Sequence, residues 1–267
     1  MIVHNNLNKN YWEDPLRYWD FDSYKDLAPD DIHVYIGCDW DAMKNSNVEG
    51  KKICCHFEEV FDDLDGTETL IAPFCDEMLT ISKTASLKKP NRKYVYFPLN
   101  EKYLPEKILS PSEKIYDACY TGNHNGTSPV PEIFNTLGSM SYGKYVLASF
   151  SRGTHTNVTY QQKLQLINES KITVTHNSTR AYAQLKSRSF EAAFNKSLIL
   201  CCEKFCDYME PWFTKDKHFI TFKEGELSKR LNEVLLDYES YYNMIEETYD
   251  LAINNYTVKN FIKDFLC

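Results

Sequence analysis

The segment Lys186-Ser-Arg-Ser-Phe-Glu-Ala-Ala193 shows how the second half of the chain folds. Its apolar residues recur at helical spacing, and the run Lys171–Thr175 before it has the length and the β-branched residues of a buried strand. Another apolar run, Ser197–Cys202, follows after a short turn. Strand, helix and strand in this order indicate a βαβ unit on a parallel sheet.

The same alternation continues in both directions from this segment. The further strand-like runs are Ile115–Tyr120 and Lys144–Ala148, and the further helical patterns are Pro131–Tyr142, Tyr160–Asn168, Leu227–Leu236, Tyr238–Ala252 and Val258–Leu266. Open α/β sheets bind ligands where loops leave the carboxyl ends of the strands. We therefore expect a site in the loops 121–128, 150–159 and 176–185. We also expect a tail of helices to close this half of the chain.

The first half of the chain predicts a second, smaller α/β layer. Its strand-like runs are His33–Ile36, Lys52–Cys55, Met78–Ile81 and Tyr94–Phe97. The first thirty residues are aromatic and acidic with little periodicity, which favours a segment packed on a domain surface. Three prolines, Pro98, Pro105 and Pro111, mark a junction. We therefore expect two lobes, residues 1–110 and 111–267.

Composition excludes several classes of protein. The 267 residues are 43% hydrophobic and 25% charged, which is typical of a globular protein. With 38 acidic and 30 basic residues the net charge is −8, which argues against nucleic acid as the main partner. We expect no secretory signal and no membrane span, because no run approaches ~20 apolar residues. The nine cysteines include Cys54-Cys55 and Cys201-Cys202 in apolar runs, which favours a reducing, cytoplasmic compartment.

Charged residues gather at the start of the helix predicted after Thr175. Arg180, Lys186 and Arg188 supply cations, and Glu191 follows one turn into the helix. A helix N-terminus flanked by cations is suited to a diphosphate, and a carboxylate one turn further can accept two ribose hydroxyls. The group therefore indicates a nucleotide site, with a solvated charged face as the alternative.

Four segments in this order resemble the donor-binding half of glycosyltransferases with the GT-B fold, most closely the exostosin-like and spore-coat CgeB-like groups. They are Lys186–Ala193, Leu198–Leu200, Asp207–Phe213 and Lys217–Phe222, and the similarity continues through Tyr238–Leu251 and Asn255–Phe261. The resemblance implies two Rossmann-like lobes. It also implies transfer of a sugar from a nucleotide-diphosphate donor, such as UDP-xylose or UDP-N-acetylglucosamine, to a hydroxyl of a glycan or glycoconjugate. Because the animal exostosin-like enzymes are membrane-anchored, a cytoplasmic viral or bacterial enzyme fits this chain better.

The resemblance also assigns roles to residues. It implies that Arg188 contacts the donor diphosphate and that Glu191 holds the ribose. The other expected donor-site residues are Gly122, Asn123, Arg152, Arg180, Lys186 and Ser187. Where the family has a glycine after this helix, the chain has Asn195-Lys196, and we expect Asn195 to adopt the left-handed cap conformation.

An inverting transferase needs a base that takes the proton of the acceptor hydroxyl. We expect this base in the first lobe, with Glu58 as the first candidate because it follows the strand at 53–55. Asp76 is either a base or a turn residue, and Asp39 follows the strand at 33–36. A retaining mechanism needs no such base; inversion is the expectation from the exostosin-like relatives.

A metal site is the remaining alternative. Asp39-Trp-Asp41 matches the Asp-x-Asp signature of metal-dependent transferases, but Asp20-x-Asp22 and Asp63-x-Asp65 match it equally well. The cysteines form no Cys-x-x-Cys pair. We therefore expect an enzyme that needs neither metal nor cofactor. The rival hypotheses are a metal-dependent transferase that uses Asp39 and Asp41, and a glycan- or nucleotide-binding module without chemistry.

Overall fold

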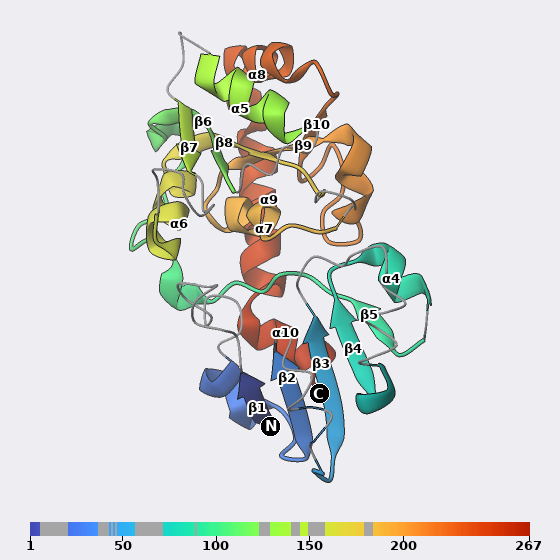
Figure 1. The fold of residues 1–267 in the computed structure, drawn as a ribbon. Helices are drawn as coiled ribbons and strands as arrows, with labels where there is room; N and C mark the ends of the chain where they lie inside the picture. Colours follow the sequence, from blue (N-terminus) through green and yellow to red (C-terminus); the bar gives the residue numbers. More distant parts are fainter. Residues whose placement is uncertain are drawn as a thin grey trace. The chain divides into compact units, whose positions relative to one another are not determined.

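The computed structural model describes residues 1–5, 21–36, 43, 45, 47–56, 72–88, 90–122, 129–139, 145–148, 158–178 and 184–267 (Figure 1). The chain forms two compact units, one of residues 1–100 and 256–267 and the other of residues 101–255. Each unit contains a five-stranded sheet whose strands are all parallel. The predicted α/β fold with two Rossmann-like lobes is confirmed.

The sheet of the second unit has the strand order β10-β9-β8-β6-β7. Its strands are β6 (Tyr116–Thr121), β7 (Tyr145–Ala148), β8 (Ser170–Thr175), β9 (Leu198–Cys202) and β10 (Ile220–Phe222). The chain runs from β6 outward to β7 and then back past β6 to β8. The direction of winding therefore reverses between β6 and β8, and open α/β sheets bind ligands at the carboxyl ends of such a pair.

Helices cover both faces of this sheet. They are α5 (Val130–Ser139), α6 (Tyr160–Asn168), α7 (Ser187–Phe194), α8 (Leu227–Leu236) and α9 (Tyr242–Asn255), with 3-10 turns at Glu101–Tyr103, Pro111–Glu113, Glu203–Tyr208 and Tyr238–Tyr241. Figure 1 shows α5 and α8 on one face and α7 with α9 on the other. Alternate residues of β8 serve the two faces, since Ile172 and Val174 join the apolar core under α5 and α8.

The turn after α7 differs from the expectation. Asn195 has φ −110° and caps the helix, whereas Lys196 has φ 49° and is the residue in the left-handed region. A residue with a Cβ is strained in this conformation. The Lys196 side chain is held by α9, because its Nζ lies 2.5 Å from Glu246 Oε2 and 4.6 Å from the centre of the Tyr249 ring.

The buried Lys114 joins the C-terminal ends of α6 and α7. Lys114 Nζ donates to the carbonyl of Asn168 at 2.5 Å, where α6 ends, and to the carbonyl of Asn195 at 2.6 Å, where α7 ends. These carbonyls have no partner within their own helices, so a donor is needed there. Burial lowers the pKa of Lys114 to about 7. Lys114 therefore fixes α7 relative to α6.

The sheet of the first unit has the order β1-β2-β3-β4-β5. Its elements are β1 (Ile2–Asn5), β2 (Ile32–Ile36), β3 (Lys51–His56), β4 (Glu77–Thr80), β5 (Arg92–Tyr94), α4 (Lys83–Lys88), α10 (Val258–Phe265) and 3-10 turns at Phe21–Leu27 and Ala72–Phe74. Three expected strands are present. The fourth, β5, ends at Tyr94 rather than Phe97, and the edge strand β1 was not expected.

The last helix groups with the first unit, whereas we expected all closing helices in the second lobe. The N–H of Val258 donates to the carbonyl of Leu99 at 3.0 Å. The Phe261 ring packs against Phe21 and Tyr96, at centroid distances of 5.7 and 5.4 Å. Aromatic burial of this kind outweighs the position of the helix in the sequence. The boundary between the units accordingly falls at residue 100 rather than 110.

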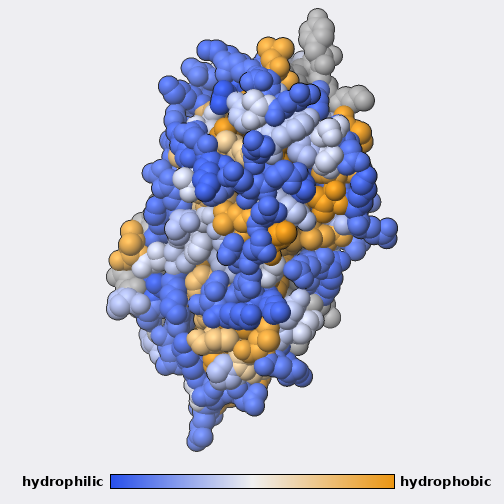
Figure 2. Space-filling view, turned by 180° about the vertical axis from the view of Figure 1, so that it is seen from behind, coloured by the Kyte–Doolittle hydropathy of each residue, from blue (hydrophilic) through white to orange (hydrophobic). Residues whose placement is uncertain are grey.

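The surface is largely polar on the face shown in Figure 2, where hydrophobic residues form separate groups among hydrophilic ones. Large apolar side chains that are exposed include Leu87 on α4 and Leu236 at the end of α8. None of the helices in the described part of the chain has the length and apolar character that a membrane span requires.

Candidate functional site

The carboxyl ends of β6 and β8 bring three segments together with the start of α7. Thr121 ends β6 and Gly122 follows it. After β8 come His176, Asn177 and Ser178, and Lys186 precedes α7. Three expected donor-site residues, Asn123, Arg152 and Arg180, lie outside the described residues. The structure thus describes the base of this site.

Arg188 lies at the centre of the group. It is 8% exposed, its Nε donates to the carbonyl of Thr121 at 2.5 Å, and its Cζ lies 4.2 Å from the centre of the Tyr120 ring. Nη1 is buried and has no hydrogen-bond partner among the residues that the structure describes. A buried guanidinium is always charged and needs acceptors for its N–H groups. Arg188 can therefore hold an anion at this edge of the sheet.

Gly122 makes room for this guanidinium. A Cβ atom at Gly122 would collide with Nη2 of Arg188 and lie 3.1 Å from Oη of Tyr120. The glycine is therefore required by the close approach of a neighbouring side chain. We expected it in the loop facing the donor, and the structure adds that it borders Arg188.

His176 and Tyr120 form a hydrogen-bonded row beside Arg188. Nε2 of His176 lies 3.0 Å from Oη of Tyr120, and Nδ1 lies 2.8 Å from Oγ of Ser178. Burial, with Arg188 and Lys186 adding to it, lowers the pKa of His176 well below its usual value, so the imidazole is neutral at pH 7. Sequence reasoning missed these three residues, although His176 opens one of the loops in which we expected a site.

Asn177 fixes the start of α7 relative to β8. Its Oδ1 accepts the N–H of Lys186 at 3.2 Å, and its Nδ2 donates to the carbonyl of Phe205 at 3.2 Å. The carbonyl of Asn177 accepts the N–H of Gln184 at 2.9 Å. The N-terminus of α7, with Lys186 and Ser187, is thereby held at the carboxyl edge, where its N–H groups favour negative charge.

Glu191 has a partner that the sequence did not reveal. The residue is 1% exposed, and its Oε2 lies 2.5 Å from Nζ of Lys163 on α6, which is also buried. Glu191 follows Arg188 by one turn, so both project from related positions on α7. The ion pair joins α6 to α7 and holds the carboxylate in one place.

Of the three candidate bases in the first unit, Asp76 is the one that lies among the described residues. Asp76 is exposed just before β4, and its Oδ2 accepts the N–H of Lys52 at 2.7 Å at the start of β3. This is the amino edge of the sheet, opposite to the edge that carries chemistry in parallel sheets, so its position favours the alternative of a turn residue. Glu58, Asp39 and Asp41 lie outside the described residues.

The described residues contain no group of three or more His, Cys, Asp or Glu side chains arranged to hold a metal ion. The Asp-x-Asp triplets at 39–41 and 63–65 lie outside this part of the chain, as does Asp20 of the triplet at 20–22.

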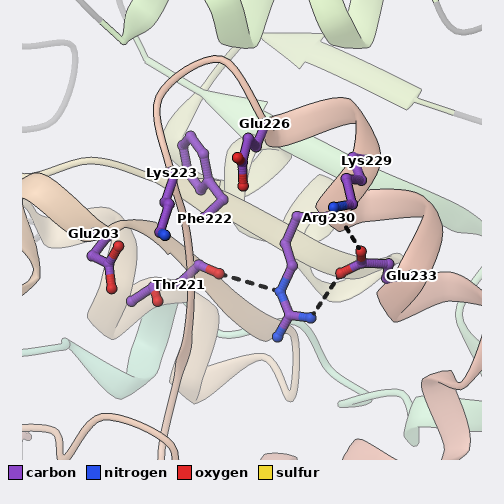
Figure 3. Close-up of a pocket in the computed structure, with 8 residues that line it drawn as sticks. All are labelled: Glu203, Thr221, Phe222, Lys223, Glu226, Lys229, Arg230 and Glu233. Carbon is purple, nitrogen blue, oxygen red and sulfur yellow. Dashed lines mark hydrogen bonds and ion pairs between the residues drawn. The ribbon is translucent and has the colours of Figure 1, made fainter.

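A hollow of about 170 Å³ lies between β10 and α8 (Figure 3). Arg230 reaches from α8 and donates from Nε to the carbonyl of Thr221 at 3.2 Å, while its Nη1 lies 3.2 Å from Oε2 of Glu233. Lys229 Nζ lies 3.9 Å from the other oxygen of Glu233. Because acidic and basic side chains neutralise each other here, this hollow is unsuited to a diphosphate.

Comparison with known proteins identifies the family. Residues 129–266 match the family described as "Glycosyl transferase-like". No curated protein matches the chain in sequence.

Solved structures share the fold at low sequence identity. One is TarM from S. aureus, in complex with fondaparinux, alpha-GlcNAc-glycerol and UDP, with TM-score 0.64, 11% identity and coverage of 91% of this chain and 57% of TarM. Another is sucrose-phosphate synthase from Thermosynechococcus elongatus, with TM-score 0.66, 8% identity and coverage of 91% and 74%. A third is Alr3699/HepE from Anabaena in complex with UDP-glucose, with TM-score 0.65, 9% identity and coverage of 88% and 78%.

The chain spans just over half the length of the TarM chains that it matches. The matched segment of the family nevertheless covers α5 to α10, including Arg188 and the helices that support it. The chain therefore belongs to the glycosyl transferase-like family and has a GT-B-type fold.

Proposed function

We propose that the chain is a glycosyltransferase that moves a sugar from a nucleotide-diphosphate donor to a hydroxyl of a glycan or glycoconjugate. The observation that carries the proposal is Arg188, a buried guanidinium whose Nη1 has no partner among the described residues and which lies at the start of α7. A diphosphate supplies the negative charge and the acceptor oxygens that such a group requires. Membership of the glycosyl transferase-like family supports the same activity.

In the reaction, an acceptor oxygen attacks the anomeric carbon of the donor while the bond from that carbon to the diphosphate oxygen breaks. The electron pair leaves with the nucleoside diphosphate, and the acceptor proton passes to a base. Arg188, Lys186 and the N–H groups at the start of α7 stabilise the departing charge because they are already oriented before the bond breaks.

The donor is a uridine-diphosphate sugar such as UDP-xylose or UDP-N-acetylglucosamine. The resemblance to the exostosin-like and CgeB-like groups supports this choice, and two neighbours in fold were solved with UDP or UDP-glucose. Glu191 accepts the ribose hydroxyls while the ion pair with Lys163 holds its carboxylate in place.

Transfer proceeds without a metal ion, because Arg188, Lys186 and the α7 N-terminus supply the positive charge. Inversion requires a base, for which Glu58 is the first candidate and Asp39 the second. Both follow the carboxyl end of a strand, since β3 ends at His56 and β2 at Ile36.

The first test is the melting temperature with UDP, GDP, CMP or ADP, each with and without Mn²⁺. A ligand that binds only the folded state raises this temperature. We expect UDP to raise it without Mn²⁺, Arg188→Ala to remove the shift and Arg230→Ala to retain it. A shift that needs Mn²⁺ would favour a metal site at Asp39 and Asp41. No shift with any nucleotide would contradict the donor site.

Chemistry is tested separately from binding. Glycosyltransferases release free sugar slowly when water replaces the acceptor, so we expect UDP and sugar to accumulate from the preferred UDP-sugar. A protein that binds the donor but leaves it intact would instead be a binding module on a transferase fold.

A further inference from the structure

Three side chains, one on β6 and two in the segment that follows β8, support the guanidinium of Arg188. The Tyr120 ring lies under it, with Cζ 4.2 Å from the ring centre. His176 continues the row from Oη of Tyr120 at 3.0 Å to Oγ of Ser178 at 2.8 Å. All three supporting residues are buried.

Two hydrogen-bond directions satisfy the row, and the neighbouring cation favours the one that turns the lone pairs of the phenol oxygen toward it. A neutral imidazole has one N–H and one acceptor nitrogen. If Tyr120 O–H donates to Nε2 of His176, then Nδ1–H donates to Ser178, and both nitrogens are satisfied. The phenol oxygen then keeps its lone pairs on the side of the cation, and a protonated His176 would break the row by losing its acceptor. Burial and the two nearby cations lower the pKa of His176 and so preserve this state.

Contacts within the protein hold part of the Arg188 guanidinium and leave one of its nitrogen atoms for a ligand. Nε is fixed by the carbonyl of Thr121, and the face of the guanidinium is fixed by the Tyr120 ring. What remains is Nη1, buried and without a hydrogen-bond partner among the described residues. The Tyr120 ring under Arg188 is in turn held in one orientation by His176, which follows the neighbouring strand β8.

We propose that Tyr120 and His176 are positioning residues for the donor: the hydrogen-bonded row from Ser178 through His176 to Tyr120 holds the Arg188 guanidinium where it meets the diphosphate of a nucleoside-diphosphate sugar. This inference rests on the proposed function, since it gives Arg188 its ligand. It adds Tyr120 on β6 and His176 just after β8, which act through Arg188 and not by contact with the donor.

The test compares dissociation constants for UDP, measured by calorimetry. Tyr120→Phe keeps the ring and removes the hydroxyl, so it costs one hydrogen bond of the support, and we expect UDP to bind roughly fivefold more weakly. His176→Leu should weaken binding to a similar extent, and His176→Gln should restore most of the affinity because its amide oxygen can accept from Tyr120.

The matched control is Tyr238→Phe. Tyr238 belongs to the same apolar core, and its Oη donates to the carbonyl of Lys171 at 3.0 Å, away from Arg188. This variant also loses a buried hydrogen bond, so its melting temperature should fall while its affinity for UDP stays within twofold of the parent.

A double-mutant cycle separates positioning from general support of the fold. In an Arg188→Lys background the planar group is gone, so Tyr120→Phe should change affinity by less than twofold. An undiminished effect in that background, or no effect of Tyr120→Phe and His176→Leu on the parent, would overturn the inference. If the parent protein binds no nucleoside diphosphate, the proposed function fails together with it. If it binds UDP through Arg188 but the row has no influence, only the inference fails.

Discussion

Arg188 and Arg230 belong to the same unit and to the same kind of position, a helix beside a strand of one sheet. Each donates from Nε to a backbone carbonyl of that strand, Thr121 for Arg188 and Thr221 for Arg230. They differ in the rest of the guanidinium. Arg230 gives its Nη1 to Glu233, whereas Nη1 of Arg188 is buried without a partner among the described residues.

This difference distinguishes a cation whose charge is matched within the protein from one that is suited to bind a ligand. An arginine whose charge is matched by a neighbouring carboxylate has no reason to attract an anion. An arginine that is buried over an aromatic ring keeps its charge and its donors, and both are available to a ligand. Substitutions of Arg230 therefore serve as controls for substitutions of Arg188 in the same unit.

The largest effect is expected from removing the two guanidinium groups one at a time. Arg188→Ala should lower the rate of sugar transfer about 1000-fold, because a donor that stabilises the departing charge is lost from a preorganised site. Arg230→Ala should leave the rate within twofold. Steady-state kinetics with a UDP-sugar measures both, and comparable losses in the two variants would abolish the distinction.

Lys163 is a third kind of cation, buried and paired. Lys163→Met leaves Glu191 buried without this partner, so we expect the free energy of unfolding to fall by about 3 kcal/mol. The control is Lys171→Met, whose pair with Asp117 is partly exposed and should cost about 1 kcal/mol or less. Urea unfolding measures both. Equal losses would mean that burial adds nothing to the pair that joins α6 and α7.

Gly122 tests whether the position of Arg188 matters and not only its charge. In Gly122→Ala the new methyl group meets Nη2 of Arg188, so the guanidinium must move, and we expect UDP to bind about tenfold more weakly. Gly138→Ala is the matched control, because no atom lies within 4 Å of its Cβ in α5. That change should raise the free energy of unfolding by about 1 kcal/mol and leave binding unchanged. Retained affinity in Gly122→Ala would show that Arg188 tolerates displacement.

The fold was predictable from periodicity to a large extent. The helices Tyr160–Asn168 and Leu227–Leu236 begin and end at the predicted residues, because each presents a regular apolar face to the core. The edge strand β1 was missed because it has only four residues, two of them polar at its end. The last helix groups with the first unit and not with the second, where we expected it, because aromatic contacts to Phe21 and Tyr96 join residues far apart in sequence.

The site was predictable only where its signal is local. Lys186, Arg188 and Glu191 share one helix start, so their charges could be read from a single segment. Tyr120 and His176 are 56 residues apart and meet because β6 pairs with β8. Lys163 meets Glu191 from another helix in the same way. Partners that depend on strand order or on helix packing leave no pattern in the sequence around either residue.

Near neutral pH the smallest expected effect comes from Lys114, which gives a dependence of stability on pH. Burial lowers its pKa to about 7 in the folded chain, while an unfolded lysine titrates near 10.4. Between these values the unfolded chain binds more protons, so stability rises with pH by at most about 1.4 kcal/mol per pH unit, and this contribution is flat below pH 7. A neutral amine still has two N–H groups for the carbonyls of Asn168 and Asn195.

Urea unfolding between pH 6.5 and 9 checks this prediction by comparing the parent with Lys114→Met. The stability difference between them should widen as pH rises, while Lys107→Met, which removes an exposed lysine, should give a curve parallel to the parent. A gap that narrows with pH would show that Lys114 stays charged. The contrast with Arg188 then follows from chemistry, because a buried lysine can lose its proton when no anion is near, whereas a buried arginine cannot. The anionic ligand of the proposed function is the partner that such a permanent buried cation would gain at Arg188.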